Sequence, residues 1–319
     1  MIKILGGFFM DNKGKVWMWI AIVAIIVVII LLVYPYFMGD KEEPVPEEIV
    51  EDDTSKPENP DEQEPIDTEY TQKDLNEESV LALAWLQNSG EYSALCYQAF
   101  NVAKMAFDEL SAANESEKKK AVVVDVDETV LDNSYFNVDL IGTENAYSDE
   151  LWNEWVEKES ATAVPGAVEF LEYVAENGGE VFYVTNRKQK DDIDLSEATI
   201  NNLKEIGFPN VDETHLMLRT AESSKEARRQ VIEENYEIVL LVGDNLNDFS
   251  EMFNISGSDM RKKKVEENKL DFGKKFIVLP NPVYGDWEGN LGDDYFKMSP
   301  EEKSQTRLKS LTNIKGTSY

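Results

Sequence analysis

The sequence predicts an α/β fold in which helices cover both faces of a mostly parallel β-sheet. Two observations indicate this fold: short apolar, largely β-branched runs have the character of buried strands, and helical stretches separate most of them. Such alternation is typical of crossover units, in which a helix returns the chain to the same edge of the sheet. The predicted strands are residues 121–124, 181–185, 215–218, 238–242 and 276–279.

The start of the chain predicts a membrane anchor. Residues 16–39 carry no charge, and a helix of this length, at about 1.5 Å per residue, spans roughly 36 Å, enough to cross a bilayer. Lysines precede the span and acidic residues follow it, which predicts a single-pass protein of the cell membrane with residues 1–15 in the cytoplasm and the main domain on the extracytoplasmic side. A cleaved signal peptide is the alternative, but it would have a shorter apolar core and a small-residue cleavage site that is not evident here.

Residues 40–72 predict an acidic, disordered linker. Between residues 40 and 69 there are 14 acidic residues, two basic residues and five prolines. Few apolar groups are present to offset the entropy lost on ordering. The globular domain is therefore expected over residues 73–319.

Composition narrows the classes of function. The chain has 63 acidic and 31 basic residues and a formal net charge of −32, which argues against a nucleic acid polymer as partner because phosphate-backbone binding requires clustered Lys and Arg. With Cys96 as its only cysteine and His215 as its only histidine, the chain offers no intrachain disulfide and no Cys or His cluster for zinc. Cys96 lies in an apolar stretch and is expected to be a buried structural thiol.

Helical periodicity accounts for the segments around and between the strands. Two amphipathic helices are predicted after Gln72 from the spacing of apolar residues, namely Leu81, Leu83, Trp85 and Leu86 and then Ala94, Tyr97, Phe100, Ala103 and Phe107. Further helices are predicted at residues 164–177, 196–206 and 223–234.

Two pairs of acidic residues follow predicted strands. Asp125 and Asp127 come directly after residues 121–124, and Asp244 follows residues 238–242 with Asp248 four residues later. Ligands of such sheets bind at the carboxyl ends of the strands. Residues two apart on an extended chain point to the same side, so Asp125 could attack a phosphoryl group while Asp127 reaches its leaving oxygen. Oxygen ligands without a His or Cys cluster select a hard cation, with Mg²⁺ preferred.

Groups that suit a phosphate follow the other strands. Thr185 ends the predicted strand of residues 181–185, and Asn186 and Arg187 follow it directly. A hydroxyl, strand-end amides and a guanidinium at this position could bind phosphate oxygens. Lys225 opens a predicted helix, whose amino terminus favours anions. Each feature alone is weak, but their combination in this order indicates phosphoryl chemistry.

The same motifs resemble the bacterial class C acid phosphatases of the haloacid dehalogenase (HAD) superfamily. The resemblance rests on Asp-Val-Asp-Glu-Thr-Val-Leu-Asp-Asn, Thr-Asn-Arg, the Lys225 helix, Gly-Asp-Asn-Leu-Asn-Asp-Phe and the later Leu-Pro-Asn-Pro-Val-Tyr-Gly-Asp-Trp-Glu-Gly segment, and it covers roughly residues 76–308. It implies a Rossmann-like core with a small cap inserted at about residues 133–160. Many relatives carry a lipid-accepting Cys after a signal sequence, which this chain lacks. Val126 and Phe136 also stand where other residues are usual in the family.

The resemblance also implies roles for the site residues. Asp125 would form an aspartyl-phosphate, and Asp127 would protonate the leaving group and then activate water. Asp125, the backbone carbonyl of Asp127 and Asp244 would hold Mg²⁺, with Asp248 nearby or through water. Thr185 and Lys225 would hold the phosphoryl oxygens.

Two aromatic residues bear on the substrate. Similar family members dephosphorylate nucleoside monophosphates with the base stacked between aromatic rings, and the corresponding positions here are Tyr147 and Tyr284. Packing within the cap is an equal explanation for Tyr147. Substrates are therefore expected to be small-molecule phosphomonoesters, including 5′-nucleoside monophosphates.

Two alternatives to a hydrolase stay open. An aspartyl-phosphate can be intercepted by an alcohol instead of water, which would make the protein a phosphotransferase. A non-catalytic surface protein can also use the same fold, although that reading predicts loss of the nucleophile, and all four aspartates are present. The sequence does not fix the oligomeric state.

Overall fold

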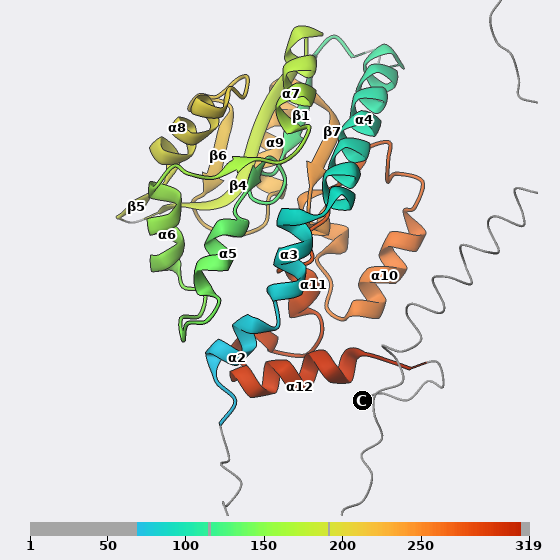
Figure 1. Cartoon of the computed structure of the whole chain (residues 1–319). Coiled ribbons are helices and arrows are strands. Elements are labelled where there is room, and N and C mark those ends of the chain that lie inside the picture. The colour runs from blue at the N-terminus through green and yellow to red at the C-terminus, as the bar shows by residue number, and fades with distance from the viewer. Residues whose placement is uncertain (1–68, 114–115, 191, 314–319) are drawn as a thin grey trace, which may run out of the picture. The chain divides into compact units, whose positions relative to one another are not determined.

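The computed structural model describes residues 69–113, 116–190 and 192–313 (Figure 1). The predicted cytoplasmic segment, the membrane anchor and the linker up to residue 68 lie outside the described residues. No helix among the residues described has the length and apolar character needed to cross a membrane.

A six-stranded sheet forms the centre of the domain. Its strands β6 (Leu216–Arg219), β4 (Glu180–Lys190), β1 (Lys119–Val124), β7 (Tyr236–Gly243) and β8 (Phe276–Val278) lie side by side in this order and are parallel. The short β5 (Ile193–Asp194) pairs antiparallel with the end of β4. The predicted α/β fold with a mostly parallel sheet is confirmed, and every predicted strand is present.

Helices cover both faces of this sheet, because its central strands are apolar on both sides. In β1, Val122 and Val124 belong to a core cluster with residues of α4 (Gly90–Ala113), α7 (Ala167–Glu176) and α8 (Ser196–Ile206). Ala121 and Val123 belong to a second cluster with Ile232 of α9 (Glu226–Asn235). Val265 of α10 (Ser258–Glu267) also packs against the second cluster. Cys96 is fully buried in the first cluster, as expected, and burial raises the pKa of its thiol to about 11.

The insertion expected at residues 133–160 has its own small structure. A two-stranded antiparallel ribbon of β2 (Leu131–Asp132) and β3 (Thr162–Ala163) closes its base. Between these strands lie α5 (Ser134–Leu140) and α6 (Asp149–Glu157), and the Ser148 side chain caps α6 by accepting from the Leu151 N–H. The α6 stretch has apolar and acidic residues on opposite faces, so it packs on the core while facing water.

The two ends of the described domain lie together (Figure 1). Helix α2 (Gln72–Glu77), which precedes α3 (Val80–Asn88), packs against α12 (Pro300–Ser310). Glu78 accepts hydrogen bonds from Ser304 Oγ at 2.6 Å and Arg307 Nη1 at 2.8 Å, and Arg307 Nη2 also binds Glu288 of α11 (Asp286–Gly289) at 2.6 Å. We call Glu78, Glu288, Ser304 and Arg307 the end clamp.

Candidate active site

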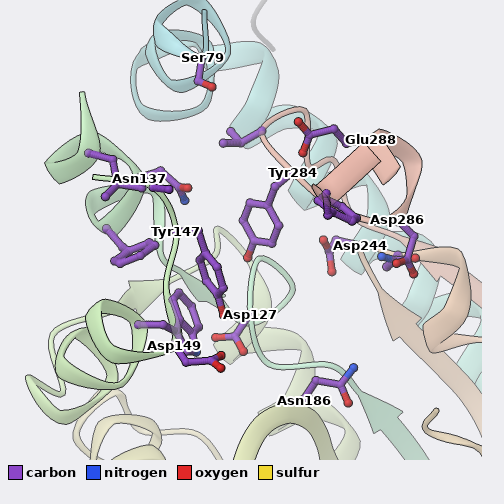
Figure 2. Close-up of a pocket in the computed structure, with 18 of the residues that line it drawn as sticks. Ser79, Asp127, Asn137, Tyr147, Asp149, Asn186, Asp244, Tyr284, Asp286 and Glu288 are labelled. Atoms are coloured by element: carbon purple, nitrogen blue, oxygen red, sulfur yellow. The ribbon is translucent and has the colours of Figure 1, made fainter. Parts of the chain in front are cut away.

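A cavity of about 740 Å³ opens where the carboxyl ends of β1, β4 and β7 meet. Asp125, Asp127, Lys225, Asp244 and Asp248 all line it. Figure 2 shows Asp127 and Asp244 facing this cavity from the sheet. The residues that the sequence places after separate strands thus come together, because parallel strands end at one edge.

Three carboxylates form the centre of the site. Asp125, Asp244 and Asp248 each offer an oxygen, and these atoms lie within 4.8 Å of one another. Asp125 continues β1, with its N–H donating to the Val242 carbonyl at 2.9 Å. Asp244 is oriented by Asn281 Nδ2 at 2.9 Å and Thr129 Oγ1 at 3.3 Å.

Asp248 is fixed by the backbone of the loop that carries it. It ends the 3₁₀ turn η1 (Leu246–Asp248), and its Oδ2 accepts from the Asn245 N–H at 2.9 Å in a capping box. Gly243 makes this possible, since a Cβ at that position would lie 2.4 Å from Asp248 Oδ2. The loop therefore requires glycine for close approach rather than for an unusual φ.

Lys225 lies among the carboxylates. Its Nζ donates to Asp125 Oδ1 and, at 2.6 Å, to Asp248 Oδ1, and the residue is 6% exposed. Burial alone would lower the pKa of Lys225, but Asp125 and Asp248 outweigh burial and raise it, so the side chain is an ammonium. It precedes α9 directly, as the sequence predicted.

One ammonium does not balance the three carboxylates, of which Asp125 and Asp248 are buried and Asp244 is half-buried. Burial, with repulsion from Asp248, raises the pKa of Asp244 to about 7. Burial also raises the pKa of Asp125 well above its ordinary value, although Lys225 opposes this. Oxygen donors with excess negative charge suit a hard divalent cation. These residues therefore fit the divalent metal ion predicted from the sequence.

Asp127 points into the same cavity but is held by different partners. Its Oδ1 accepts from Arg187 Nη2 at 2.8 Å and Nε at 3.1 Å, and from Asn133 Nδ2 at 3.0 Å, while Oδ2 accepts from Thr185 Oγ1 at 3.2 Å. Arg187 is 2% exposed, and its Nη1 donates to Thr199 at 3.1 Å. The sequence suggested Arg187 as a phosphate ligand, whereas in the structure its guanidinium binds Asp127.

A bulge in β4 presents the phosphate-binding candidates. Val184 pairs with Met217 and Lys188 with Arg219, so β4 advances four residues while β6 advances two. Bulges at the end of a strand redirect side chains toward a site. Arg228 holds the bulge by donating to the Thr185 carbonyl and, at 2.7 Å, to Asn186 Oδ1. Asn186 is exposed at the cavity and Thr185 is buried.

Aromatic residues form the outer wall of the cavity. Tyr147 is 60% exposed and contacts Phe136 and Trp152 with ring centroids 6.1 and 6.3 Å apart. Tyr284 lines the cavity from the loop before α11, and its hydroxyl donates to the buried Glu128 carboxylate. Figure 2 shows both tyrosines at the cavity. Tyr147 therefore both packs against aromatic residues of the cap and lines the cavity.

Sequence reasoning did not identify four positioning residues. Glu128 adopts a left-handed backbone with φ 56° and binds Tyr284 and the Asn133 N–H. Asn133, Arg228 and Asn281 orient Asp127, the β4 bulge and Asp244 as described above. Glu128 and Asn133 belong to the motif after β1, Asn281 to the Leu-Pro-Asn-Pro segment and Arg228 to the Lys225 helix. The motifs therefore held a signal for all four residues, but no sequence pattern showed which contacts they make.

Comparison with known proteins is consistent with this geometry. Residues 53–287 match the family model of HAD superfamily, subfamily IIIB (Acid phosphatase). The structure is similar to that of the class C acid phosphatase from Bacillus anthracis, with a TM-score of 0.70 and 39% identity, covering 75% of this chain and 99% of that one. A second structure of that enzyme, with tungstate bound, matches equally well.

Curated plant proteins are more distant. The chain is 30% identical over 171 residues to acid phosphatase 1 of Solanum lycopersicum, covering 51% of this chain and 57% of that protein. It is 28% identical to vegetative storage protein 1 of Arabidopsis thaliana, again over 171 residues, covering 51% and 54%. The chain thus spans little more than half the length of these relatives.

Proposed function

Because the chain belongs to subfamily IIIB of the HAD superfamily, the acid phosphatases, we propose that it is a Mg²⁺-dependent phosphatase that hydrolyses phosphomonoesters through an aspartyl-phosphate on Asp125. The observation that carries the proposal is the convergence of Asp125, Asp244 and Asp248 around Lys225 in one cavity.

Asp125 suits the role of nucleophile. Lys225 binds its Oδ1, while among the described residues no donor binds its Oδ2. In the first step Oδ2 attacks phosphorus, the bond from phosphorus to the ester oxygen breaks, and the alcohol leaves. Water then attacks the phosphorus, the bond to Asp125 breaks, and inorganic phosphate is released.

Asp127 suits the role of acid and then base. It gives its proton to the departing ester oxygen and takes one from the attacking water. Arg187, Thr185 and Asn133 fix its carboxyl group at the cavity. Because the first step needs a protonated Asp127, we expect an acidic working pH, and a maximal rate at alkaline pH would contradict the role.

Phosphate and metal are proposed to lie side by side. Asp125, Asp244 and the Asp127 carbonyl would hold Mg²⁺, with Asp248 adjacent, and the ion would supply a Lewis acid that offsets phosphoryl charge. Thr185, Asn186 and Lys225 would bind phosphoryl oxygens. The tungstate in the Bacillus anthracis enzyme supports a tetrahedral oxyanion site on this fold.

Substrates are proposed to include 5′-nucleoside monophosphates. Tyr147 and Tyr284 both line the cavity that holds the aspartates. Stacking a base on an aromatic ring contributes about 1–3 kcal/mol. Replacing both tyrosines by Ala should thus lower kcat/KM for a nucleotide more than for a small aryl phosphate.

We also propose that residues 16–39 anchor the protein in the cell membrane with the phosphatase domain outside the cytoplasm. The support is the uncharged span with lysines before it and acidic residues after it. Accessibility of the domain to protease added to intact cells tests this topology. Protection of the domain would argue for the opposite orientation.

The central test is phosphate release by residues 72–319 with and without Mg²⁺ and a chelator. We expect Mg²⁺-dependent hydrolysis of an aryl phosphate and of nucleoside monophosphates, abolished in Asp125→Asn. Full activity of Asp125→Asn would exclude it as nucleophile. Added acceptor alcohol would separate hydrolysis from phosphotransfer.

A further inference from the structure

Arg219 is a cation at the active cavity to which no carboxylate of the described residues binds. It ends β6, the strand next to β4, and lines the same cavity as Asp125 and Asp127. In the part of the chain that the structure describes, no hydrogen bond or ion pair reaches its guanidinium. This is unexpected in a chain with 63 acidic and 31 basic residues.

Other cations around the cavity have partners. Lys225 binds Asp125 and Asp248, Arg187 binds Asp127, and Arg307 binds Glu78 and Glu288. Lys303 has its Nζ 5.9 Å from the centroid of the Tyr295 ring. Unlike Lys225, Arg187 and Arg307, Arg219 thus presents to the cavity a charge that no carboxylate of the described residues binds.

Arg219 lies close to both the phosphate-binding bulge and the outer aromatic wall. Met217, two residues before it, pairs with Val184, the last residue before the bulge, so Arg219 lies about 7 Å further along the strand direction. Arg219 also lines the cavity together with Tyr147, and its guanidinium opposes the rise in the pKa of that hydroxyl. Arg219 therefore lines the cavity at a level further along the strands than the residues at the start of the bulge.

Lys188 adds a second charge at this position. It pairs with Arg219 across β4 and β6 and lines the cavity. Its partner is Asp149 of α6, whose side chain is 58% exposed. Exposed ion pairs of this kind are weak, so an anionic substrate group can compete for Lys188.

We propose that Arg219, with Lys188, forms a subsite for a second anionic group on the substrate, so that the enzyme prefers phosphomonoesters that carry a further phosphate or a carboxylate. Guanidinium and ammonium groups bind both anions through charge-assisted hydrogen bonds. The subsite rests on the proposed function, since it lies in the cavity where Asp125 would act. It adds a determinant of specificity that acts separately from base stacking.

The test compares matched substrates in the Mg²⁺-loaded phosphatase domain. One pair is adenosine 3′,5′-bisphosphate against 5′-AMP, and the other is 3-phosphoglycerate against glycerol 3-phosphate. In the wild type we expect a higher kcat/KM for the member that carries the second anionic group in at least one pair, and the responding pair identifies the anion. In Arg219→Gln this preference should fall about tenfold or more, from the value of a charge-assisted hydrogen bond, and Arg219→Lys should retain part of it.

Lys204→Gln is the matched control. Lys204 lies exposed on α8, away from the cavity, and the change removes the same unit of charge. It should leave both ratios as in the wild type. An equal fall in Lys204→Gln would assign the effect to net charge and overturn the subsite.

Failure of the subsite and failure of the function are distinguishable. Equal ratios in wild type and Arg219→Gln, with 5′-AMP still hydrolysed, would overturn the subsite and leave the phosphatase intact. No hydrolysis of any ester by folded wild-type protein would overturn the proposed function and the subsite with it.

Discussion

Replacing Gly243 by Ala should weaken metal binding through Asp248. The new Cβ would lie 2.4 Å from Asp248 Oδ2 and 2.6 Å from its Cβ, whereas ordinary contact begins at 3.4 Å. Asp248 must then move by about 1 Å, yet Asn245 N–H and Lys225 Nζ bind its two oxygens at 2.9 and 2.6 Å. The substitution must therefore break one of these two hydrogen bonds of Asp248 or deform the η1 turn.

The size of the effect follows from these contacts. Loss of a hydrogen bond to a charged group costs about 1.5–3 kcal/mol, which lowers Tm by about 3–12 °C for a domain of this size. Displacing a carboxylate beside a metal site weakens metal binding by about 10- to 100-fold. A Mg²⁺ titration of aryl phosphate hydrolysis, with melting curves at each concentration, measures both quantities.

Gly90→Ala provides the matched control. Gly90 begins α4, and a Cβ there would meet nothing within 4 Å, so this variant should match or exceed the stability of the wild type. If Gly243→Ala required no more Mg²⁺ than Gly90→Ala, the steric account of the Asp248 loop would be refuted.

Three further changes test other contacts. Arg187→Lys should lower kcat about tenfold or more with a smaller change in KM. The loss in kcat should be larger for alkyl than for aryl phosphates, because poor leaving groups depend most on protonation by Asp127. Equal losses on both esters would deny Arg187 a role in orienting Asp127. Glu78→Gln should lower Tm by about 2–4 °C at neutral pH. Burial raises the pKa of Glu78, but bonds from Ser304, Tyr70 and Arg307 outweigh it and lower the pKa. This stabilisation is therefore fully present above the usual value of about 4.3 and is lost as the pH falls from there through the lowered pKa; a Tm difference that does not shrink on acidification below about 4.3 would contradict this. Tyr284→Phe removes the hydroxyl that binds Glu128 but keeps the ring. It should raise KM for nucleotides by about 2- to 10-fold and alter KM for an aryl phosphate less. An equal rise in KM for both substrates would argue against a contact between Tyr284 and the nucleotide.

Much of the fold could be predicted because the strands are short and apolar on both faces. Residues 196–206 were predicted as a helix and α8 has the same bounds. By contrast, α10 has a weak apolar stripe and only Arg261 is buried in it, so periodicity did not reveal it. The extension of β4 from Asn186 to Lys190 is polar, and apart from the buried Arg187 it is half-buried or exposed. It is determined by pairing with β5 and β6 rather than by local composition.

The positions of site residues could be predicted where the residues directly follow a strand. They could not be predicted where they depend on contacts between residues far apart in the sequence. Asp125, Asp127, Asp244, Asp248 and Lys225 meet as expected because each lies near the carboxyl edge of the sheet. Arg187 was expected to bind phosphate, but its partner Asp127 is 60 residues away in the chain. Such pairing depends on the β4 bulge, which no local pattern indicates.

The end clamp implies an uneven distribution of local stability. Its bonds join polar side chains at the edge of the domain, with the Arg307 and Glu78 side chains 27% and 32% exposed, whereas β1 and β7 are held by buried apolar packing. Added salt weakens the former more than the latter, so amide hydrogens of α2 and α12 should exchange through sub-global opening well before those of the central strands. Arg307 and Glu288 also line the cavity, so each such opening would briefly remove part of the cavity wall. The lifetime of the bound substrate would then depend on ionic strength, through ion pairs that lie far from the reacting phosphate.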